Sequence, residues 1–260
     1  MGKISSKVCR ECSECLPFLK ISRKNSLQYL ELAEYGYAKS DYKDIVEEKK
    51  IDIESTASSV DSSEFLDIYT RPLEQNCEKM IDKEGFLVYG QDLDEGFLVK
   101  AQWKSKFTPK EILDYFRLNN ERKIWDKNID QVEEIPGETL DEYITYTKFK
   151  KVIAISQRDM LIISNIIERS DGILVVSKSI EHEKYPELSD VTRMKIYTAG
   201  YYFEDIIDEE YKTKVFSLTK ANFGGSISQK FVKKATAIAL PKLYQAMEKC
   251  MEKYYKSINS

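Results

Sequence analysis

The stretch DMLIISNIIERSDGILVVSKSIEH (159–182) contains two apolar runs separated by an Asp171-Gly172 turn. Both runs are rich in β-branched residues, which pack well on the pleated surface of a sheet. An Asp-Gly pair between two such runs is a strong hairpin signal, because glycine accepts the backbone conformation that a tight turn requires. The stretch therefore predicts two neighbouring antiparallel strands.

Runs of similar composition flank this hairpin on both sides. Residues 86–107 indicate two strands around an acidic turn, and Pro136-Gly137 marks another turn. The further candidates are 130–135, 142–151, 192–205 and 213–222. Neighbouring runs are too close together for crossover helices, so the sequence predicts an antiparallel sheet.

Three helices are predicted around these strands. Residues 62–82 favour a helix that Pro72 breaks. Residues 108–126 begin with a threonine cap, a proline in the first turn and an acid three residues after the cap, which is typical of a helix start. Apolar residues recur at helical spacing over 227–254, and we expect Pro241 to kink or interrupt this last helix.

The order of these elements predicts an α+β fold, with a strongly curved antiparallel sheet wrapped around a long C-terminal helix. Three regions follow from the composition. Residues 1–24 are basic and rich in cysteine, 25–61 form a linker or a weakly helical segment, and 62–258 form the folded domain.

The charge of the chain is unevenly distributed. The 260 residues carry a formal net charge of −4, which argues against a nucleic-acid partner. Residues 1–24 hold six lysines and arginines against two glutamates. A basic end on an acidic body predicts that the N-terminal region meets an anionic surface.

The sequence contains neither a membrane span nor a secretory signal. No stretch approaches the roughly 18 consecutive apolar residues of a membrane span, and the start has no apolar core of a secretory signal. Five cysteines, three of them crowded at one end, do not form the pattern of a secreted disulfide framework. We therefore expect a cytoplasmic protein.

The opening MGKISSKVCRECSEC fits a lipid-modified end. Gly2 and Ser6 satisfy the N-myristoylation pattern, and cysteines just beyond it suit palmitoylation. These cysteines are Cys9, Cys12 and Cys15. One myristoyl chain holds a membrane only marginally, whereas a second acyl chain or a basic patch makes attachment stable. We predict dual acylation that holds the protein on the cytosolic face of a membrane.

Two alternatives for the same cysteines stay open. Their spacing could supply three thiolates to a metal ion, but a fourth ligand is missing nearby, since Cys77, His182 and Cys250 are distant in the sequence. The cluster could also have no function. We expect neither a metal nor a cofactor.

Catalytic motifs are scarce. The one histidine, His182, lies at a strand end before a proline and reads as a polar loop residue. The DLDEG segment (92–96) does not match a calcium loop, because its glycine and final acid are misplaced. FGGS (223–226) precedes a helix without a Gly-Lys-Ser/Thr sequence, so it predicts a tight turn rather than a phosphate loop.

Five short motifs follow one another along residues 62–257: ERKIWD (121–126), SQRDM (156–160), SKSIEHEKYP (177–186), DVTRMKIY (190–197) and ANFGGSISQKFVKK (221–234). In this order they resemble the motifs of the StAR-related lipid transfer (START) family. The resemblance implies a helix-grip fold, in which a curved antiparallel sheet and the C-terminal helix enclose a cavity for one lipid.

Three positions depart from the family pattern. Asn222 and Ser228 replace the usual aspartate and proline before the last helix, so the start of that helix is expected to differ in detail. Sterol-binding members carry an arginine at the position of Ser164, paired with an acid on the neighbouring strand, and the segment ITYTKFKKV (144–152) contains no acid here. The resemblance therefore implies a phospholipid rather than a sterol.

Phosphatidylcholine-binding members of the family suggest the head-group contacts. Their phosphate-contacting arginine corresponds to Arg122, with Asp126 as the companion acid, although Arg122 and Asp126 could instead form a structural ion pair. Tyr197 and Met160 fall on positions of the choline cage, and the third aromatic residue of that cage is missing.

The lipid is expected to pass a gate at the mouth of the cavity. Val152, Ile153 and Ile155 lie in the loop that covers this mouth in the family fold. The start of the last helix places Phe231 among cations that suit an anionic bilayer, namely Lys230 and Lys233. The alternative is that Val152–Ile155 extends a buried strand and that the lysines form an ordinary solvated face.

These observations predict a monomeric, non-catalytic protein that binds one lipid and transfers it between membranes. Two alternatives remain open: an enzyme of the hydrolase or cyclase type on the same fold, and a membrane-tethered adaptor with an occluded cavity. The enzyme would need a titratable pair inside the cavity, and the adaptor would show an interior filled by aromatic side chains.

Overall fold

A computed structural model describes residues 60–139, 141–151 and 156–258. Contacts divide the chain into two units, Met1–Ser55 and Thr56–Ser260, and the described residues lie in the second. The predicted lipidation sites and the expected gate residues Val152, Ile153 and Ile155 lie outside the described residues.

The described residues form four helices and ten strands. The helices are α3 (Ser63–Thr70), α4 (Pro109–Arg117), α5 (Asn119–Trp125) and α6 (Gln229–Ile258). The strands are β1 (Glu78–Lys83), β2 (Phe86–Leu93), β3 (Gly96–Ser105), β4 (Ile129–Pro136), β5 (Glu142–Phe149), β6 (Gln157–Arg169), β7 (Gly172–Ser179), β8 (Val191–Arg193), β9 (Lys195–Asp205) and β10 (Thr213–Asn222).

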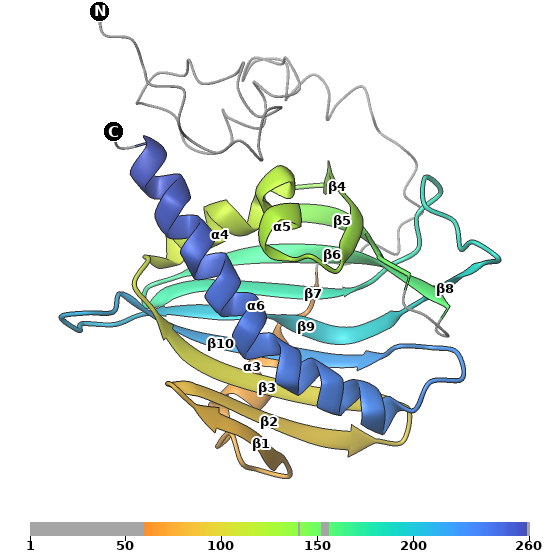
Figure 1. Cartoon of the computed structure of the whole chain (residues 1–260), viewed down its shortest axis with the longest axis horizontal. Helices are drawn as coiled ribbons and strands as arrows, with labels where there is room; N and C mark the ends of the chain where they lie inside the picture. Colours follow the sequence, from red (N-terminus) through yellow and green to blue (C-terminus); the bar gives the residue numbers. More distant parts are fainter. Residues whose placement is uncertain (1–59, 140, 152–155, 259–260) are drawn as a thin grey trace, which may run out of the picture. The chain divides into compact units, whose positions relative to one another are not determined.

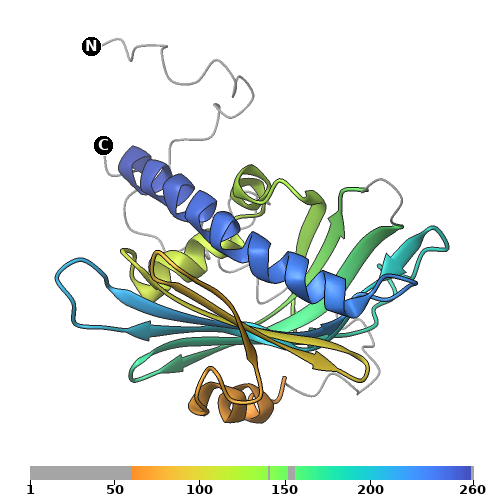
Figure 2. The same ribbon diagram turned by 60° about the horizontal axis from the view of Figure 1, so that its bottom comes forward.

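Nine of these strands form one antiparallel path in the order β1-β2-β3-β10-β9-β7-β6-β5-β4, and β8 pairs in parallel with β6 beside this path (Figure 1). Helix α6 crosses one face of the curved sheet, and α3 lies against the opposite face (Figure 2). The arrangement confirms the predicted α+β helix-grip fold. The parallel pairing of β8 is the exception to the expected antiparallel sheet.

Side chains alternate between two cores, because successive residues of a strand point to opposite faces. On β3, Val99 and Trp103 face α6 and belong to the inner core, whereas Leu98 faces α3 and belongs to the outer core. Phe65 of α3 is fully buried in the outer core. The sheet is therefore covered on both faces, and its inner face carries the long helix.

The helix starts follow the capping rules. The Thr108 hydroxyl accepts a hydrogen bond from the backbone N–H of Glu111, and the Glu111 carboxylate accepts one from the backbone N–H of Thr108. Ser228 precedes α6, and its hydroxyl accepts from the N–H of Phe231 over 3.4 Å. Serine thus supplies a capping oxygen where the family pattern has proline.

Three expectations about the helices need correction. Helix α3 ends before Pro72 as predicted, but residues 78–82 belong to the edge strand β1. Residues 108–126 form two helices, because the backbone of Leu118 is extended. Helix α6 continues through Pro241 without interruption, since the buried side chains on both sides of this residue keep the helix against the sheet.

Candidate functional site

The inner face of the sheet is only partly covered by α6. This helix packs mainly against β1, β2, β3 and α5, so the inner faces of β5, β6 and β7 lie beyond its main contacts. Apolar side chains there are half-buried: Met160, Ile162, Ile166 and Ile173. The outer-face residues of the same strands are buried: Leu161, Ile163, Leu174 and Val176. The inner face of these three strands, which lies outside the main contacts of α6, is the candidate site.

Arg122 brings a positive charge to this surface from α5. Helix α5 is tied to α4 by the hydroxyl of Tyr115, which donates to the Glu121 carboxylate over 3.0 Å. The Nε atom of Arg122 is buried and has no hydrogen-bond partner, and its guanidinium forms no ion pair within the described part of the chain. Burial raises the pKa of the phenol groups of Tyr143 and Tyr201. The positive charge of Arg122 lowers both pKa values, but by less than burial raises them.

A second arginine lies beside it. Arg117, at the end of α4, donates to the Glu134 carboxylate of β4 over 2.7 Å, and its guanidinium lies 4.7 Å from the ring centre of Tyr143 on β5. Burial raises the pKa of Tyr143 to about 12, and the carboxylate of Glu134 acts in the same direction. Tyr143 therefore stays a neutral hydroxyl that can donate a hydrogen bond.

Hydroxyl groups line the strands between these charges and the apolar surface. Ser164 of β6 is buried and shares a 2.7 Å hydrogen bond with Ser177 of β7. Thr147 of β5 lies opposite Met160 in the sheet, and its buried hydroxyl has no partner among the described residues. Buried polar atoms without partners are uncommon in folded proteins and call for an explanation such as a bound ligand or water.

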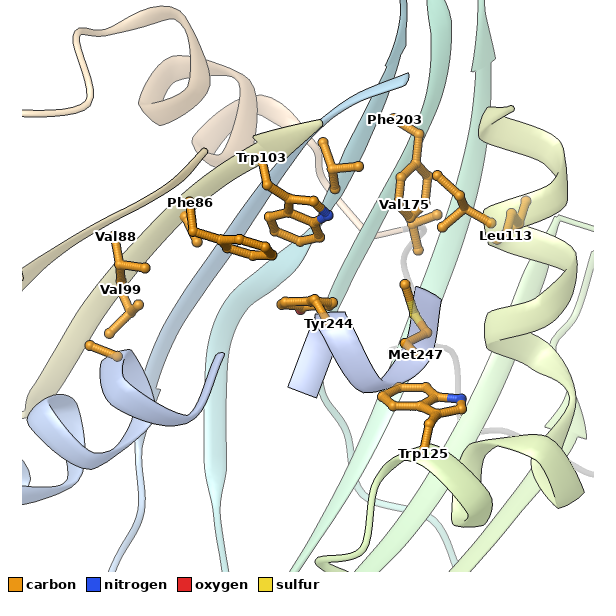
Figure 3. Packing of buried hydrophobic residues seen from close by; sticks show 14 of the residues in the cluster. Phe86, Val88, Val99, Trp103, Leu113, Trp125, Val175, Phe203, Tyr244 and Met247 are labelled. Carbon is orange, nitrogen blue, oxygen red and sulfur yellow. The ribbon is translucent and has the colours of Figure 1, made fainter. Parts of the chain in front are cut away.

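Aromatic side chains fill the space beneath the middle of α6 (Figure 3). Trp103 of β3 stacks against both Phe86 and Tyr244, with its ring centre 4.0 Å from that of Tyr244, and the rings of Phe86 and Tyr244 stack with each other as well. Burial raises the pKa of Tyr244 well above its ordinary value, and the Tyr244 hydroxyl donates to the hydroxyl of Tyr201. This cluster packs α6 against β2, β3 and β9.

The structure places the predicted head-group residues in different surroundings. Met160 and Ser164 lie on the inner face of β6, on the same surface that Arg122 reaches. The Asp126 carboxylate accepts from the backbone N–H of Asn128, and no ion pair joins it to Arg122 among the described residues. The alternative of a structural ion pair between Arg122 and Asp126 is therefore not realised in this structure.

Tyr197 lies apart from these residues. It falls at a bulge in the pairing of β9 with β10, and its hydroxyl donates to the backbone carbonyl of Glu95 over 3.1 Å. Tyr201, which does meet the Arg122 charge, is four residues further along β9, roughly 13 Å away at strand spacing. The bulge changes the direction of the side chain, which a count along the strand does not reveal.

The expected membrane-contact residues are divided by burial. Phe231 is 60% exposed and Lys230 is exposed. Lys233 is 3% exposed, and its ammonium forms an ion pair with the Asp92 carboxylate at 2.9 Å, so its expected place at an exposed surface is wrong. Helical spacing puts Lys233 on the face of α6 that meets β2, because residues two apart on a helix point in different directions.

Sequence reasoning missed several residues of the site. Arg117, Glu134 and Tyr143 come from three separate elements and meet only through the fold. Ile238 is 49% exposed and lies two turns after Phe231, so a search at helical spacing would have found it. Both residues line a shallow hollow on α6 with Lys234 and Lys242.

A curved sheet gripped by a long helix, with a partly uncovered inner face, defines the helix-grip class of binding domains. A sequence model of the START domain matches residues 77–257, and the chain belongs to the START domain family. Among the described residues, no helix combines the length and apolarity needed to cross a membrane.

Two curated relatives share a modest sequence identity with the chain. START domain-containing protein 10 of Mus musculus and of Homo sapiens are each 23% identical over 133 residues, which are 51% of this chain and 45% of the relative. The match thus spans about half the length of these curated relatives.

Two solved structures show the same fold. The crystal structure of human STARD10 aligns with a TM-score of 0.66 and 19% identity, over 74% of this chain and 79% of that chain. Human StAR-related lipid transfer protein 5 aligns with a TM-score of 0.66 and 18% identity, over 84% of this chain and 100% of that chain.

Proposed function

We propose that this START domain binds one phospholipid molecule on the inner face of its sheet and transfers it between membranes. Relatives in the family include a protein named for lipid transfer, which supports the general class. The observation that carries the phospholipid assignment is Arg122, a guanidinium with a buried Nε atom and no ion pair among the described residues.

A bound phospholipid would satisfy this arginine. Arg122 is half-buried, and its buried Nε–H lacks a partner, which is costly. A phosphate group supplies a charge-assisted hydrogen bond to a guanidinium. The hydroxyls of Tyr143 and Thr147 can complete the polar contacts. The acyl chains would cover the half-buried apolar surface that includes Met160 and Ile162, and each buried CH₂ stabilises the complex by about 0.8 kcal/mol.

A phospholipid fits this surface better than a sterol bound as in the sterol-binding members. Ser164 stands at the position of their arginine, and its hydroxyl is engaged by Ser177 at 2.7 Å. The cationic group is instead Arg122 on α5, which is suited to a phosphate. Tyr201 and Tyr143 offer rings near this charge, while Tyr197 is engaged by Glu95, so a choline group would use the first two.

The exposed face of the first half of α6 would contact the membrane during transfer. Phe231 and Ile238 present apolar groups there, and three exposed lysines lie around them: Lys230, Lys234 and Lys242. Apolar residues ringed by cations bind an anionic bilayer surface, with about 1 kcal/mol from each cation near the surface. The loop with Val152, Ile153 and Ile155 is the proposed gate.

A lipid anchor would keep the protein near its membrane. Myristoylation of Gly2 together with palmitoylation of Cys9, Cys12 or Cys15 gives two acyl chains, which stable attachment requires. We place the protein on a cytosolic membrane face, as a monomer that acts without a cofactor, a metal or a nucleic-acid partner.

The proposed function includes no covalent step. Glu134, whose charge acts on Tyr143, is already held by Arg117, and His182 lies in a loop where its Nδ1 accepts from the N–H of Lys184. Neither group is arranged as a general acid or base beside a nucleophile.

Native mass spectrometry of the protein purified from cells tests the proposal. We expect one phospholipid per chain, exchangeable with phosphatidylcholine vesicles. A chain that carries no lipid and takes none up from vesicles would contradict it.

The aromatic cluster supports a second candidate, a membrane-tethered adaptor whose interior is occluded. Phe86, Trp103 and Tyr244 already fill the space beneath α6 (Figure 3). Trp103→Ala separates the two candidates, because it opens this space. An occluded adaptor would begin to take up lipid only in the variant, whereas a transfer protein takes it up in both.

A further inference from the structure

A hollow of about 270 Å³ lies on the outer side of the sheet, away from the inner lipid surface. It is formed by α3 and its following loop on one side and by β2, β3 and β10 on the other. Figure 2 shows α3 against the face of the sheet that α6 does not cover. The hollow is therefore separate from the site around Arg122.

Lys100 of β3 lines this hollow and is only 2% exposed. Its ammonium donates to the backbone carbonyl of Pro72 over 3.3 Å, and it forms no ion pair within the described ranges. An ammonium removed from water and held by one neutral acceptor is costly, because a carbonyl replaces only part of its hydration. An anion that entered the hollow would stabilise such a charge.

The other charged groups of the hollow are neutralised in pairs. Lys220 contacts Glu64 at 2.5 Å, and Arg71 pairs with Asp67. Lys100 therefore supplies the one uncompensated charge among the charged residues that line this hollow. A dianion would exceed that single charge and would meet the carboxylates of Glu64 and Asp67.

We propose that this hollow binds a small monocarboxylate with a short apolar chain. The carboxylate would accept hydrogen bonds from the Lys100 ammonium, where charge-assisted bonds are strongest. The apolar chain would lie against Ile68 of α3 and Leu98 of β3, which also line the hollow. The volume is slightly below the roughly 300–1,000 Å³ of most ligand pockets, which limits the ligand to a few carbon atoms beyond the carboxylate.

Isothermal titration calorimetry of the full chain with sodium hexanoate tests this site. We expect saturable binding at neutral pH, weakened by about tenfold or more in Lys100→Met because a charge-assisted hydrogen bond is lost. Lys104→Met is the matched control on the same strand, since Lys104 is half-exposed and pairs with Asp208. It should bind hexanoate as the unmodified protein does.

A second variant guards against a folding defect in Lys100→Met. Ile68→Trp fills the hollow while keeping Lys100, and it should also abolish hexanoate binding. Arg122→Gln, which alters the inner site, should leave hexanoate binding unchanged. 1-Hexanol and inorganic phosphate should bind more weakly than hexanoate.

Several results would overturn the site. They are the absence of saturable hexanoate binding in the millimolar range, equal binding in Lys100→Met, and loss of binding in Arg122→Gln. If 1-hexanol bound as tightly as hexanoate, the carboxylate charge would not contribute to binding. If phosphate bound more tightly than hexanoate, the ligand would not be a monocarboxylate.

Discussion

The Tyr244 hydroxyl of α6 donates a 2.8 Å hydrogen bond to the Tyr201 hydroxyl of β9, and so links the long helix to the middle of the sheet. Tyr201 also meets the charge of Arg122. The link therefore joins the helix, the sheet and the proposed head-group site. Any ligand that displaces α6 from the sheet must break or replace it.

Tyr244→Phe should lower the free energy of unfolding by about 1 kcal/mol, because it removes one buried hydrogen bond and leaves Tyr201 without its donor. Urea denaturation measures the change. Tyr254→Phe is the control, since it removes a hydroxyl from the same helix that makes no hydrogen bond in the described structure. If both variants lowered the free energy of unfolding equally, the hydrogen bond between Tyr244 and Tyr201 would not contribute to stability.

The pair Phe231→Ser and Ile238→Ser tests the proposed membrane face of α6. Both side chains are largely exposed, so the melting temperature should not change. Cosedimentation with anionic vesicles should fall by about tenfold or more, because two apolar contacts with the bilayer are lost. Ile207→Ser, an exposed residue between β9 and β10, is the control. Unchanged sedimentation of the double variant would exclude this face.

The N-terminal anchor is tested in cells. Gly2→Ala removes the acceptor for myristoylation and should move the protein to the soluble fraction. Replacing Cys9, Cys12 and Cys15 together by serine should leave only weak, reversible attachment, because one acyl chain remains. Membrane fractions that retain both variants at the original level would refute the anchor.

Glu248 of α6 predicts a dependence of stability on pH. Burial raises the pKa of its carboxyl above the ordinary value of 4.5. The folded state then holds a proton that the unfolded state has lost, so the free energy of unfolding should decrease as pH rises from about 4.5 through the raised pKa. Glu248→Gln should remove this decrease and be the more stable protein at neutral pH.

Urea titrations at several pH values measure this effect. Glu252→Gln, an exposed glutamate one turn further along α6, should keep the decrease. If the free energy of unfolding of Glu248→Gln decreased by the same amount as pH rises, the decrease would belong to another titratable group.

Local patterns predicted most of the fold. The hairpin around Asp171-Gly172 and the cap formed by Thr108 and Glu111 depend on neighbours in the sequence, and both are found. Edge strand β1 was missed because its sequence, EKMIDK, is polar and mostly exposed, so it lacks the alternation of a half-buried strand.

The site was less predictable because its contacts are long-range. Lys233 is neutralised by Asp92, which is 141 residues earlier, and nothing local distinguishes it from exposed lysines of the same helix. Arg117, Glu134 and Tyr143 likewise meet only after β4 and β5 have paired. Arg122 could be proposed from the resemblance, but its lack of an ion pair is visible only in the structure.

The most direct test of the central proposal uses the variant Arg122→Gln. It measures how fast the variant transfers a phospholipid, and how fast it transfers a sterol, between vesicles. Phosphatidylcholine transfer should fall by about tenfold or more, because only this lipid offers a phosphate to the guanidinium. Sterol transfer and the melting temperature should stay unchanged, and Lys123→Gln, the exposed neighbour, should behave as the unmodified protein. Equal loss of both transfers together with a lower melting temperature would contradict the account, because Arg122 would then be a structural residue.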